Sequence, residues 1–265
     1  SSDLLFNSIP FFVFFPVVVL TYFLIPERLR QYWLLAASYF FYMSWNARYA
    51  LLLFGCTIVT YTGGLLMDRG KKRLTLAAGL IMVFGILFVY KYLNFSLSLA
   101  GETAALLGIE LTVPTFDIIL PVGISFFTFQ SAGYLIDVYR GDIYAERSLP
   151  RYMLFISFFP QLVAGPIERS KNLLRQLDKV YDFEYTRVRQ GLLVMLWGYF
   201  LKYCVADTCA ICVNAIFANI FAYGGTVRII GALAFTMQIY GDFMGYSTIA
   251  RGAALVLGYR LSENF

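Results

Sequence analysis

The sequence predicts an all-α polytopic membrane protein, and three observations support this fold class. Of the 265 residues, 60% are hydrophobic and only 14% are charged, whereas a soluble domain carries about 25% charged residues. The apolar residues gather in long runs, and most Lys and Arg residues fall between the runs. This composition excludes a disordered chain, a secreted disulfide scaffold and a nucleic-acid-binding domain.

Eight apolar segments are visible along the chain. They are residues 10–25, 32–46, 48–67, 74–93, 116–136, 150–167, 190–222 and 228–258. A membrane-spanning helix needs about 20 apolar residues, so the last two segments are longer than one span. We therefore expect a break or a second short helix in each of them. Since no linker or repeat is visible, residues 1–265 are expected to form a single membrane domain.

The basic loops predict the orientation of the spans. The loop of residues 26–31 contains Arg28 and Arg30, and the loop of residues 68–73 contains four basic residues. Two spans separate these loops, so both lie on the same side of the membrane. The positive-inside rule assigns that side to the cytoplasm and places the N-terminus outside.

The segment of residues 150–167 cannot be a simple span, because the polar stretches on both sides of it are basic and therefore cytoplasmic. It also contains Pro160 and Pro166, which disfavour a continuous helix. A re-entrant segment, which enters and leaves on one face, accounts for both features. Irregular backbone at membrane depth must be buried in protein or line a wet cavity, so the sequence predicts an internal cavity. Residues 168–190 are expected to be a cytoplasmic amphipathic excursion, with leucines at helical spacing.

Polar residues that interrupt the apolar segments, together with a Gly-Pro pair in the re-entrant segment, are the candidates for lining or supporting that cavity. They are Ser125, Gln130, Gln161, Gly165, Pro166, Gln238, Asp242, Tyr246 and Ser247. Asp242 is the strongest candidate, since a lone charge at the centre of a spanning helix costs about 2.5–3.5 kcal/mol. The alternative interpretation is structural: the hydroxyls satisfy a kinked helix, and a hydrogen-bonded Asp242 holds helices together.

Other titratable residues give little guidance to chemistry. Lys202 and Asp207 are five residues apart and could form an ion pair if their helix bends between them. The sequence contains no histidine, the usual general base and metal ligand. Cys209 and Cys212 form a C-x-x-C pair among apolar neighbours, which is too few ligands for a zinc site. We therefore expect no metal site and no bound cofactor.

Four motifs, taken in order, resemble the membrane-bound O-acyltransferase (MBOAT) family. They are residues 5–45, residues 120–141 (LPVGISFFTFQSAGYLIDVYRG), residues 157–169 (SFFPQLVAGPIER) and residues 238–265 (QIYGDFMGYSTIARGAALVLGYRLSENF). The resemblance covers nearly the whole chain. It is closest to the AlgI-like branch that O-acetylates alginate, and the DltB-like teichoic-acid D-alanylation proteins are more distant.

The resemblance implies a ring of tilted transmembrane helices around a thin centre in the bacterial cytoplasmic (inner) membrane. It implies transfer of an acyl group from a cytoplasmic thioester, acetyl-CoA or a carrier-protein thioester, to a hydroxyl of an exported polysaccharide such as alginate or cellulose. Extracytoplasmic acetylation proteins are the expected partners. In this family the last motif is followed by helices that carry a catalytic histidine. The chain is thus expected to be the truncated, N-terminal part of the fold, inactive alone, with the catalytic histidine beyond Phe265.

Three alternatives stay open at the level of sequence. A non-catalytic acyl conduit, or a scaffold for polysaccharide-modifying partners, would explain the lack of histidine and the unusual Met244 and Thr248 in the last motif. D-alanyl transfer to teichoic acid would suit the more distant resemblance. An ion-coupled transporter built around Lys202, Asp207 and Asp242 is the third, although no inverted repeat of broken helices supports it.

Overall fold

The computed structural model describes residues 4–68, 70, 72–106, 114, 116, 120–162, 165–166 and 168–264. Most of these residues are helical, and no strand occurs among them. The elements are α1 (Ile9–Leu24), α2 (Glu27–Met43), α3 (Ala47–Asp68), α4 (Lys72–Leu106), α5 (Ile124–Arg140), α6 (Leu149–Ser157), α7 (Phe159–Leu162), α8 (Ser170–Leu177), α9 (Tyr185–Phe200), the π-helical η1 (Leu201–Ala206), α10 (Asp207–Ala218), the 3₁₀ turn η2 (Ile220–Ala222) and α11 (Gly225–Leu257).

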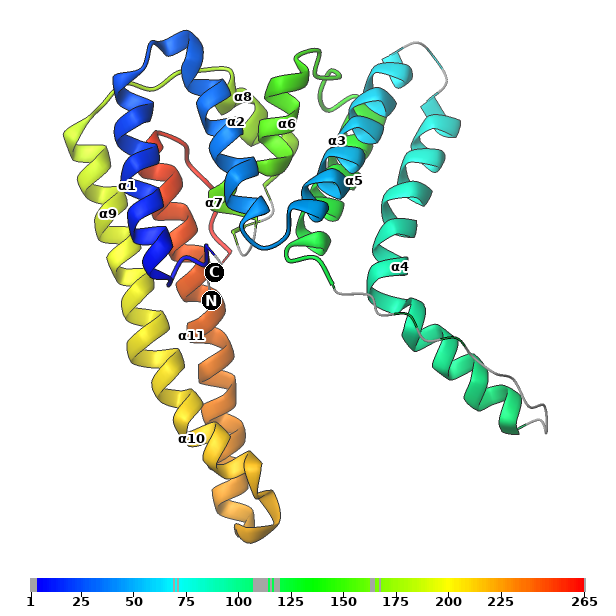
Figure 1. The fold of residues 1–265 in the computed structure, drawn as a ribbon, viewed down its shortest axis with the longest axis vertical. Helices are drawn as coiled ribbons and strands as arrows, with labels where there is room; N and C mark the ends of the chain where they lie inside the picture. Colours follow the sequence, from blue (N-terminus) through cyan, green and yellow to red (C-terminus); the bar gives the residue numbers. More distant parts are fainter. Residues whose placement is uncertain are drawn as a thin grey trace.

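The helices are arranged in three groups that stand side by side (Figure 1). On one side α1 stands with α9, α10 and α11, and on the other side α3 and α5 stand beside α4. The short helices α6, α7 and α8 lie between these groups, with α2. The far halves of α4 and of the α10–α11 hairpin extend beyond the other helices and diverge. The two ends of the chain lie close together near the centre.

Length and composition identify the membrane-crossing elements. In the described part of the chain, three helical stretches are long and apolar enough to cross a membrane: α3, α4 and the continuous stretch Tyr185–Ala218. The helix α1 is apolar but shorter. In α4 the buried residues are Gly79, Val83 and Leu87, so most of its apolar surface faces outward, as lipid contact requires. The predicted fold class, an all-α polytopic membrane protein, is confirmed.

Two predicted boundaries are wrong. The segment of residues 228–258 contains no break, because α11 runs for 33 residues without interruption. Its glycines serve close packing instead: a Cβ atom on Gly252 would lie 2.6 Å from the carbonyl oxygen of Gly191 in α9. The predicted loop of residues 26–31 is also shorter than expected, since α2 begins at Glu27, directly after Pro26. The other long segment, 190–222, does contain a distortion, the π-helical η1.

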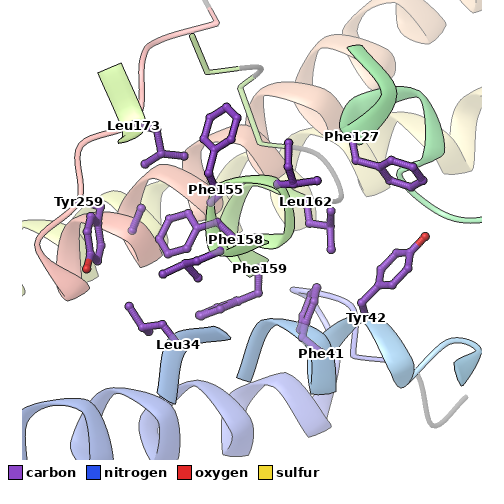
Figure 2. Close-up of a cluster of buried hydrophobic side chains, with 14 of the residues drawn as sticks. Leu34, Phe41, Tyr42, Phe127, Phe155, Phe158, Phe159, Leu162, Leu173 and Tyr259 are labelled. Atoms are coloured by element: carbon purple, nitrogen blue, oxygen red, sulfur yellow. The ribbon is translucent and has the colours of Figure 1, made fainter. Parts of the chain in front are cut away.

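The apolar core is centred on the four-residue helix α7. Aromatic and leucine side chains surround it from α2, α5, α6, α8 and the segment after α11 (Figure 2). They include Leu34, Phe41, Tyr42, Phe127, Phe155, Phe158, Phe159, Leu162, Leu173 and Tyr259. Residues 168–190 contain the short α8, whose Leu173 and Leu177 are buried while its basic residues face outward. The core thus encloses the segment that the sequence predicts to be re-entrant.

Candidate functional site

The predicted re-entrant segment is a broken helix. The helix α6 has nine residues and would be about 14 Å long, less than half of a bilayer core. It ends at Ser157, and the chain turns at Phe158 before α7 begins. In a continuous helix the N–H of Phe159 would bond to the carbonyl of Phe155, but here it donates to Oγ of Ser38 in α2 at 3.1 Å. Because Pro160 has no N–H, the break costs no further hydrogen bond at that position.

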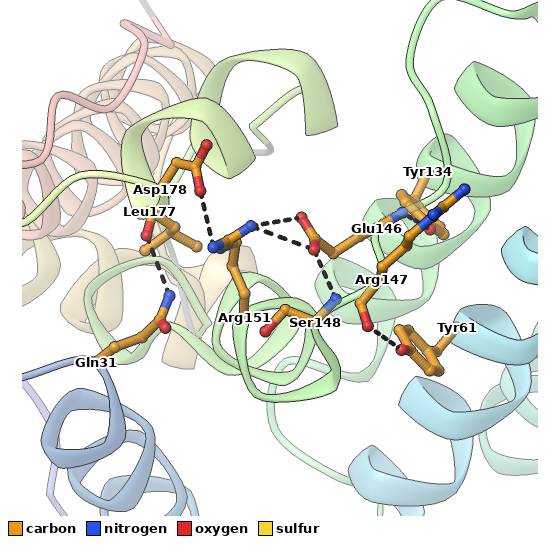
Figure 3. A network of polar contacts seen from close by, with 9 residues as sticks. All are labelled: Gln31, Tyr61, Tyr134, Glu146, Arg147, Ser148, Arg151, Leu177 and Asp178. Carbon is orange, nitrogen blue, oxygen red and sulfur yellow. Dashed lines mark hydrogen bonds and ion pairs between the residues drawn. The ribbon is translucent and has the colours of Figure 1, made fainter. Parts of the chain in front are cut away.

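The two arms of this segment return to the same face of the molecule. Arg151, in the first turn of α6, pairs with Glu146 at 3.3 Å and with Asp178, directly after α8, at 2.8 Å (Figure 3). Gln31 of α2 donates to the carbonyl of Leu177 at 3.1 Å. We call α6 the descending arm and the described residues 165–166 and 168–177 after α7 the returning arm; the Arg151–Asp178 pair joins the start of the first to the end of the second. The chain therefore enters and leaves on one side, as a re-entrant segment must.

A pair of buried amides joins this segment to α5. Nε2 of Gln130 donates to the carbonyl of Phe155 at 2.8 Å, and Nε2 of Gln161 donates to Oε1 of Gln130 at 2.6 Å. Gln130 and Gln161 are 4% and 3% exposed. Gly165 must be a glycine here, since a Cβ atom would lie 2.5 Å from Cα of Gln161. Pro166 is buried beside it. We call Gln130, Gln161 and the carbonyl of Phe155 the amide relay.

The candidates on α11 form a second, separate group. Nζ of Lys202 in η1 lies 2.6 Å from Oδ1 of Asp242 and 2.9 Å from Oδ1 of Asp207. The possible pairing of Lys202 with Asp207 is therefore present, but through a widened turn and not a bend: five residues span more than one turn of an α-helix, and the π-helical turn of η1 brings them onto one face. We call Lys202, Asp207 and Asp242 the ion triad. The lysine side chain is 14% exposed, whereas those of the two acids are 45% and 47% exposed.

Neighbouring polar groups connect α11 to both ends of the chain. The hydroxyl of Tyr246 donates to Oδ1 of Asn7 at 3.2 Å, and its ring lies 5.5 Å from Nζ of Lys202. Nδ2 of Asn264 donates to Oγ of Ser247 at 3.0 Å. Gln238, one turn before Asp242, is partly buried, and its Oε1 has no partner among the described residues. These contacts fix where the first residues and the segment after α11 lie.

The nine candidate residues therefore do not surround a single point. One group lies at the amide relay and the chain directly after α7: Gln130, Gln161, Gly165 and Pro166. The other group lies on α11 at the ion triad: Gln238, Asp242, Tyr246 and Ser247. Ser125 lies in the first turn of α5, partly exposed. Sequence reasoning missed Ser38 and Asn7. Ser38 is detectable as a polar residue in the apolar run LLAASYFF, but nothing in the sequence indicates its partner.

The segment after α11 is held by side chains from the returning arm. Glu168, 3% exposed, accepts a hydrogen bond from the backbone N–H of Ser262. Gln176 of α8 accepts from the N–H of Arg260 at 2.7 Å and donates to its carbonyl at 2.8 Å. The ring of Tyr181 packs edge-on against Tyr259, and burial raises the pKa of both phenols. The chain after α11 is thus directed back toward the re-entrant segment.

These features define a class: a polytopic α-helical membrane protein with a re-entrant segment that carries polar groups into its core. No family model matches the chain. The chain is 37% identical to the probable alginate O-acetylase AlgI of Pseudomonas aeruginosa over 98% of its own length and 50% of that protein. It is 32% identical to the peptidoglycan O-acetyltransferase of Helicobacter pylori, over 99% of this chain and 56% of that protein.

A more distant likeness points the same way. The teichoic acid D-alanyltransferase of Bacillus subtilis is 26% identical over 57% of this chain and 39% of that protein. The chain spans about half the length of the curated relatives it matches. The predicted resemblance to the AlgI-like branch of the membrane-bound O-acyltransferase family is therefore confirmed.

Proposed function

We propose that the protein of which this chain is part is an O-acetyltransferase for an exported polysaccharide. The observation that carries this proposal is the 37% identity to a probable alginate O-acetylase over 98% of the chain. O-acetyl transfer is favoured over D-alanyl transfer because the D-alanyltransferase is only 26% identical, over 57% of the chain. The polymer itself could be alginate, cellulose, peptidoglycan or a related polysaccharide.

The reaction moves an acetyl group from a thioester to an alcohol. The thioester C–S bond breaks, a C–O ester bond forms, and the hydroxyl proton is transferred to the departing sulfur through a base. Acetyl-CoA or a carrier-protein thioester on the cytoplasmic side is the proposed donor. The proposed base is a histidine elsewhere in the full-length protein, since residues 1–265 contain none. The described residues would supply the scaffold around the point of transfer, namely the re-entrant segment and the elements that hold it.

Two further features belong to the same proposal. The protein would reside in the bacterial cytoplasmic membrane, and the side with the amphipathic α8 and the 141–148 connection would face the cytoplasm. Extracytoplasmic acetylation proteins would receive the acetyl group or complete its transfer to the polymer. The three helical stretches that could cross a membrane are consistent with this placement.

The test uses the full-length protein in a bacterium whose own polysaccharide O-acetyltransferase gene has been deleted. Ester-linked acetate on the purified exopolymer is measured by NMR. We expect the full-length protein to restore acetylation and Asp242→Ala to reduce it at least tenfold, with Gln190→Ala, an exposed position on α9, as the matched control. Unchanged acetate with the full-length protein present in the membrane would contradict the proposal. If Asp242→Ala leaves the acetylation activity unchanged, the group of candidate residues on α11 does not belong to the catalytic site.

A further inference from the structure

The ion triad lies near the middle of the helices that carry it. Lys202 follows Arg189 by 13 residues, or about 20 Å of helix, and Asp242 precedes Arg251 by nine residues, or about 14 Å. Both arginines lie at the same end of the helix pair, because α9 and α11 pack antiparallel. Residues 190–250 contain a single charged side chain besides the triad, Arg228, at the other end of α11. Since the apolar core of a bilayer is about 30 Å thick, the triad lies about halfway through it.

The triad carries an excess of negative charge that faces outward. It contains one ammonium group and two carboxylates, so one negative charge is not balanced. In the described part of the chain, Lys202 is the only basic side chain paired with Asp207 or Asp242. The lysine is largely buried between the helices, whereas both acids are almost half exposed. Ionised side chains within a membrane are costly unless they face other helices or water, so the outward side of the triad does not face lipid.

The surface around the two acids is apolar and exposed. Ile211 lies one turn after Asp207 on α10, and Ile239 lies one turn before Asp242 on α11. These isoleucines are 74% and 53% exposed. We call Asp207, Ile211, Ile239 and Asp242 the hairpin face. In the described part of the chain the main packing partners of α10 are α11 and η1, and the hairpin stands apart from the other helices (Figure 1). An apolar helix face with polar groups at its centre is typical of contacts between membrane helices.

The length of the relatives and the sign of the charge indicate what covers the hairpin face. The chain spans about half of the relatives it matches, so a comparable length of the full-length protein lies outside residues 1–265. A second copy of the same face is disfavoured, because it would bring two negative clusters together. A helix with one Lys or Arg among apolar residues would instead give two charges of each sign. An ammonium or guanidinium group donates several hydrogen bonds and can contact both carboxylates.

We propose that a membrane-spanning helix from the part of the full-length protein outside residues 1–265 packs on the hairpin face. It places one Lys or Arg beside Asp207 and Asp242, and the four charges together are neutral. The contact joins the two parts of the protein at mid-membrane and holds Asp242 from both sides. The inference uses the charge and exposure of the hairpin face and does not depend on the proposed acetyl transfer.

The first test is photocrosslinking of the full-length protein in the membranes of the expressing bacterium. The photoreactive amino acid p-benzoylphenylalanine replaces Ile239 in one variant. In the control it replaces Ile81, which is 74% exposed on α4. Peptic fragments are identified by mass spectrometry. We expect Ile239 to give at least tenfold more crosslinked peptide than Ile81, with a partner peptide from outside residues 1–265 that contains Lys or Arg in an apolar stretch.

Every other crosslinking result would overturn the inference. Equal yields at the two positions would mean that the hairpin face lies in lipid and that one acid holds a proton. A product of twice the mass would identify a second copy, and a product of another mass would identify a separate protein. A partner peptide without Lys or Arg would remove the charge contact. The measurement changes no charged residue, so it does not depend on the stability of a charge variant.

The second test exchanges the charges. In full-length protein in nanodiscs, Asp207→Arg should lower the thermal midpoint by about 5 °C, because it places two cations beside the partner's basic residue. Changing that basic residue of the crosslinked peptide to Asp should restore more than half of the loss. The same change should not restore Glu102→Arg, a matched charge reversal at an exposed position on α4. No recovery of Asp207→Arg, or equal recovery of both variants, would show that the two residues do not pair.

Discussion

The amide relay and the ion triad both place polar groups inside a membrane protein, but by different means. In the relay, two neutral amides are nearly completely buried and are oriented by a backbone carbonyl. In the triad, a lysine is held between two carboxylates whose side chains are almost half exposed. Neutral amides can be buried at low cost if they are hydrogen-bonded, whereas charges need counter-charges and access to polar surroundings.

The two centres also depend on different backbone devices. The relay depends on a helix break, which frees the carbonyl of Phe155. The triad depends on a widened helical turn, η1, and on glycines that let α9 and α11 approach each other. In both cases a departure from the regular α-helix creates the polar site, as is common where helices serve a function. Three substitutions test the close helix approach, the ion triad and the surface contacts of the re-entrant segment in turn.

The largest effect is expected for Gly198→Leu. A Cβ atom at this position would lie 2.8 Å from the carbonyl oxygen of Gly245 and 2.8 Å from the backbone N of Ile249. Since these are backbone atoms, the helices α9 and α11 must move apart, at a cost of about 3 kcal/mol or more. Thermal unfolding in nanodiscs measures the loss. Gly85→Leu, on the exposed side of α4 with nothing within 4 Å of its Cβ position, should change the midpoint little. Equal losses would mean that close helix approach is unimportant.

A smaller effect is expected for Lys202→Met in the ion triad. Removal of the lysine leaves two carboxylates close together without its counter-charge, and we expect a loss of about 2 kcal/mol, reduced by their partial exposure. Asp242→Asn should cost less, because Lys202 keeps Asp207. In the double variant Lys202→Met/Asp242→Asn, the loss in the free energy of unfolding should be smaller than the sum of the two single losses. Lys91→Met, at an exposed position on α4, is the control. Strict additivity would show that Lys202 and Asp242 do not interact.

Much of this fold could be predicted from the sequence. Hydropathy indicates which segments lie within the membrane, and the basic residues indicate on which side of the membrane each loop lies. The re-entrant segment follows from the basic residues on both flanks of residues 150–167. The spacing of Lys202 and Asp207 allowed an ion pair only if their helix was distorted, and the sequence did not show that distortion. The prediction of a break in residues 228–258 was wrong, because a glycine within a helical sequence can mark either a break or a close contact with another helix. Here Gly245 and Gly252 lie against backbone atoms of α9 and η1. Nothing in the sequence of α9 and η1 identifies these two glycines as their packing partners.

The grouping of the candidate residues could not be predicted for a similar reason. A one-dimensional pattern identifies Gln161 and Asp242 as polar residues within apolar segments, but it does not determine which residues are neighbours. Ser38 and Phe159 lie 121 residues apart, and only the packing of α2 against α7 brings them together. The amide relay depends on that contact and is therefore a property of the tertiary structure.

The smallest effect is expected where the re-entrant segment is fastened at the surface. Arg151→Met removes the ion pairs to Glu146 and Asp178. Asp178 is 61% exposed, so its pair contributes little in water, whereas the side chain of Glu146 is 14% exposed and keeps the N–H of Ser148 as a partner. We expect a loss of about 1 kcal/mol, which should shrink in high salt because exposed pairs are screened. Arg28→Met, at an exposed position on α2, provides the control. A loss as large as that of Gly198→Leu would mean that the return of the chain depends on these charges. A small loss would mean that these ion pairs are not what holds the re-entrant segment in place.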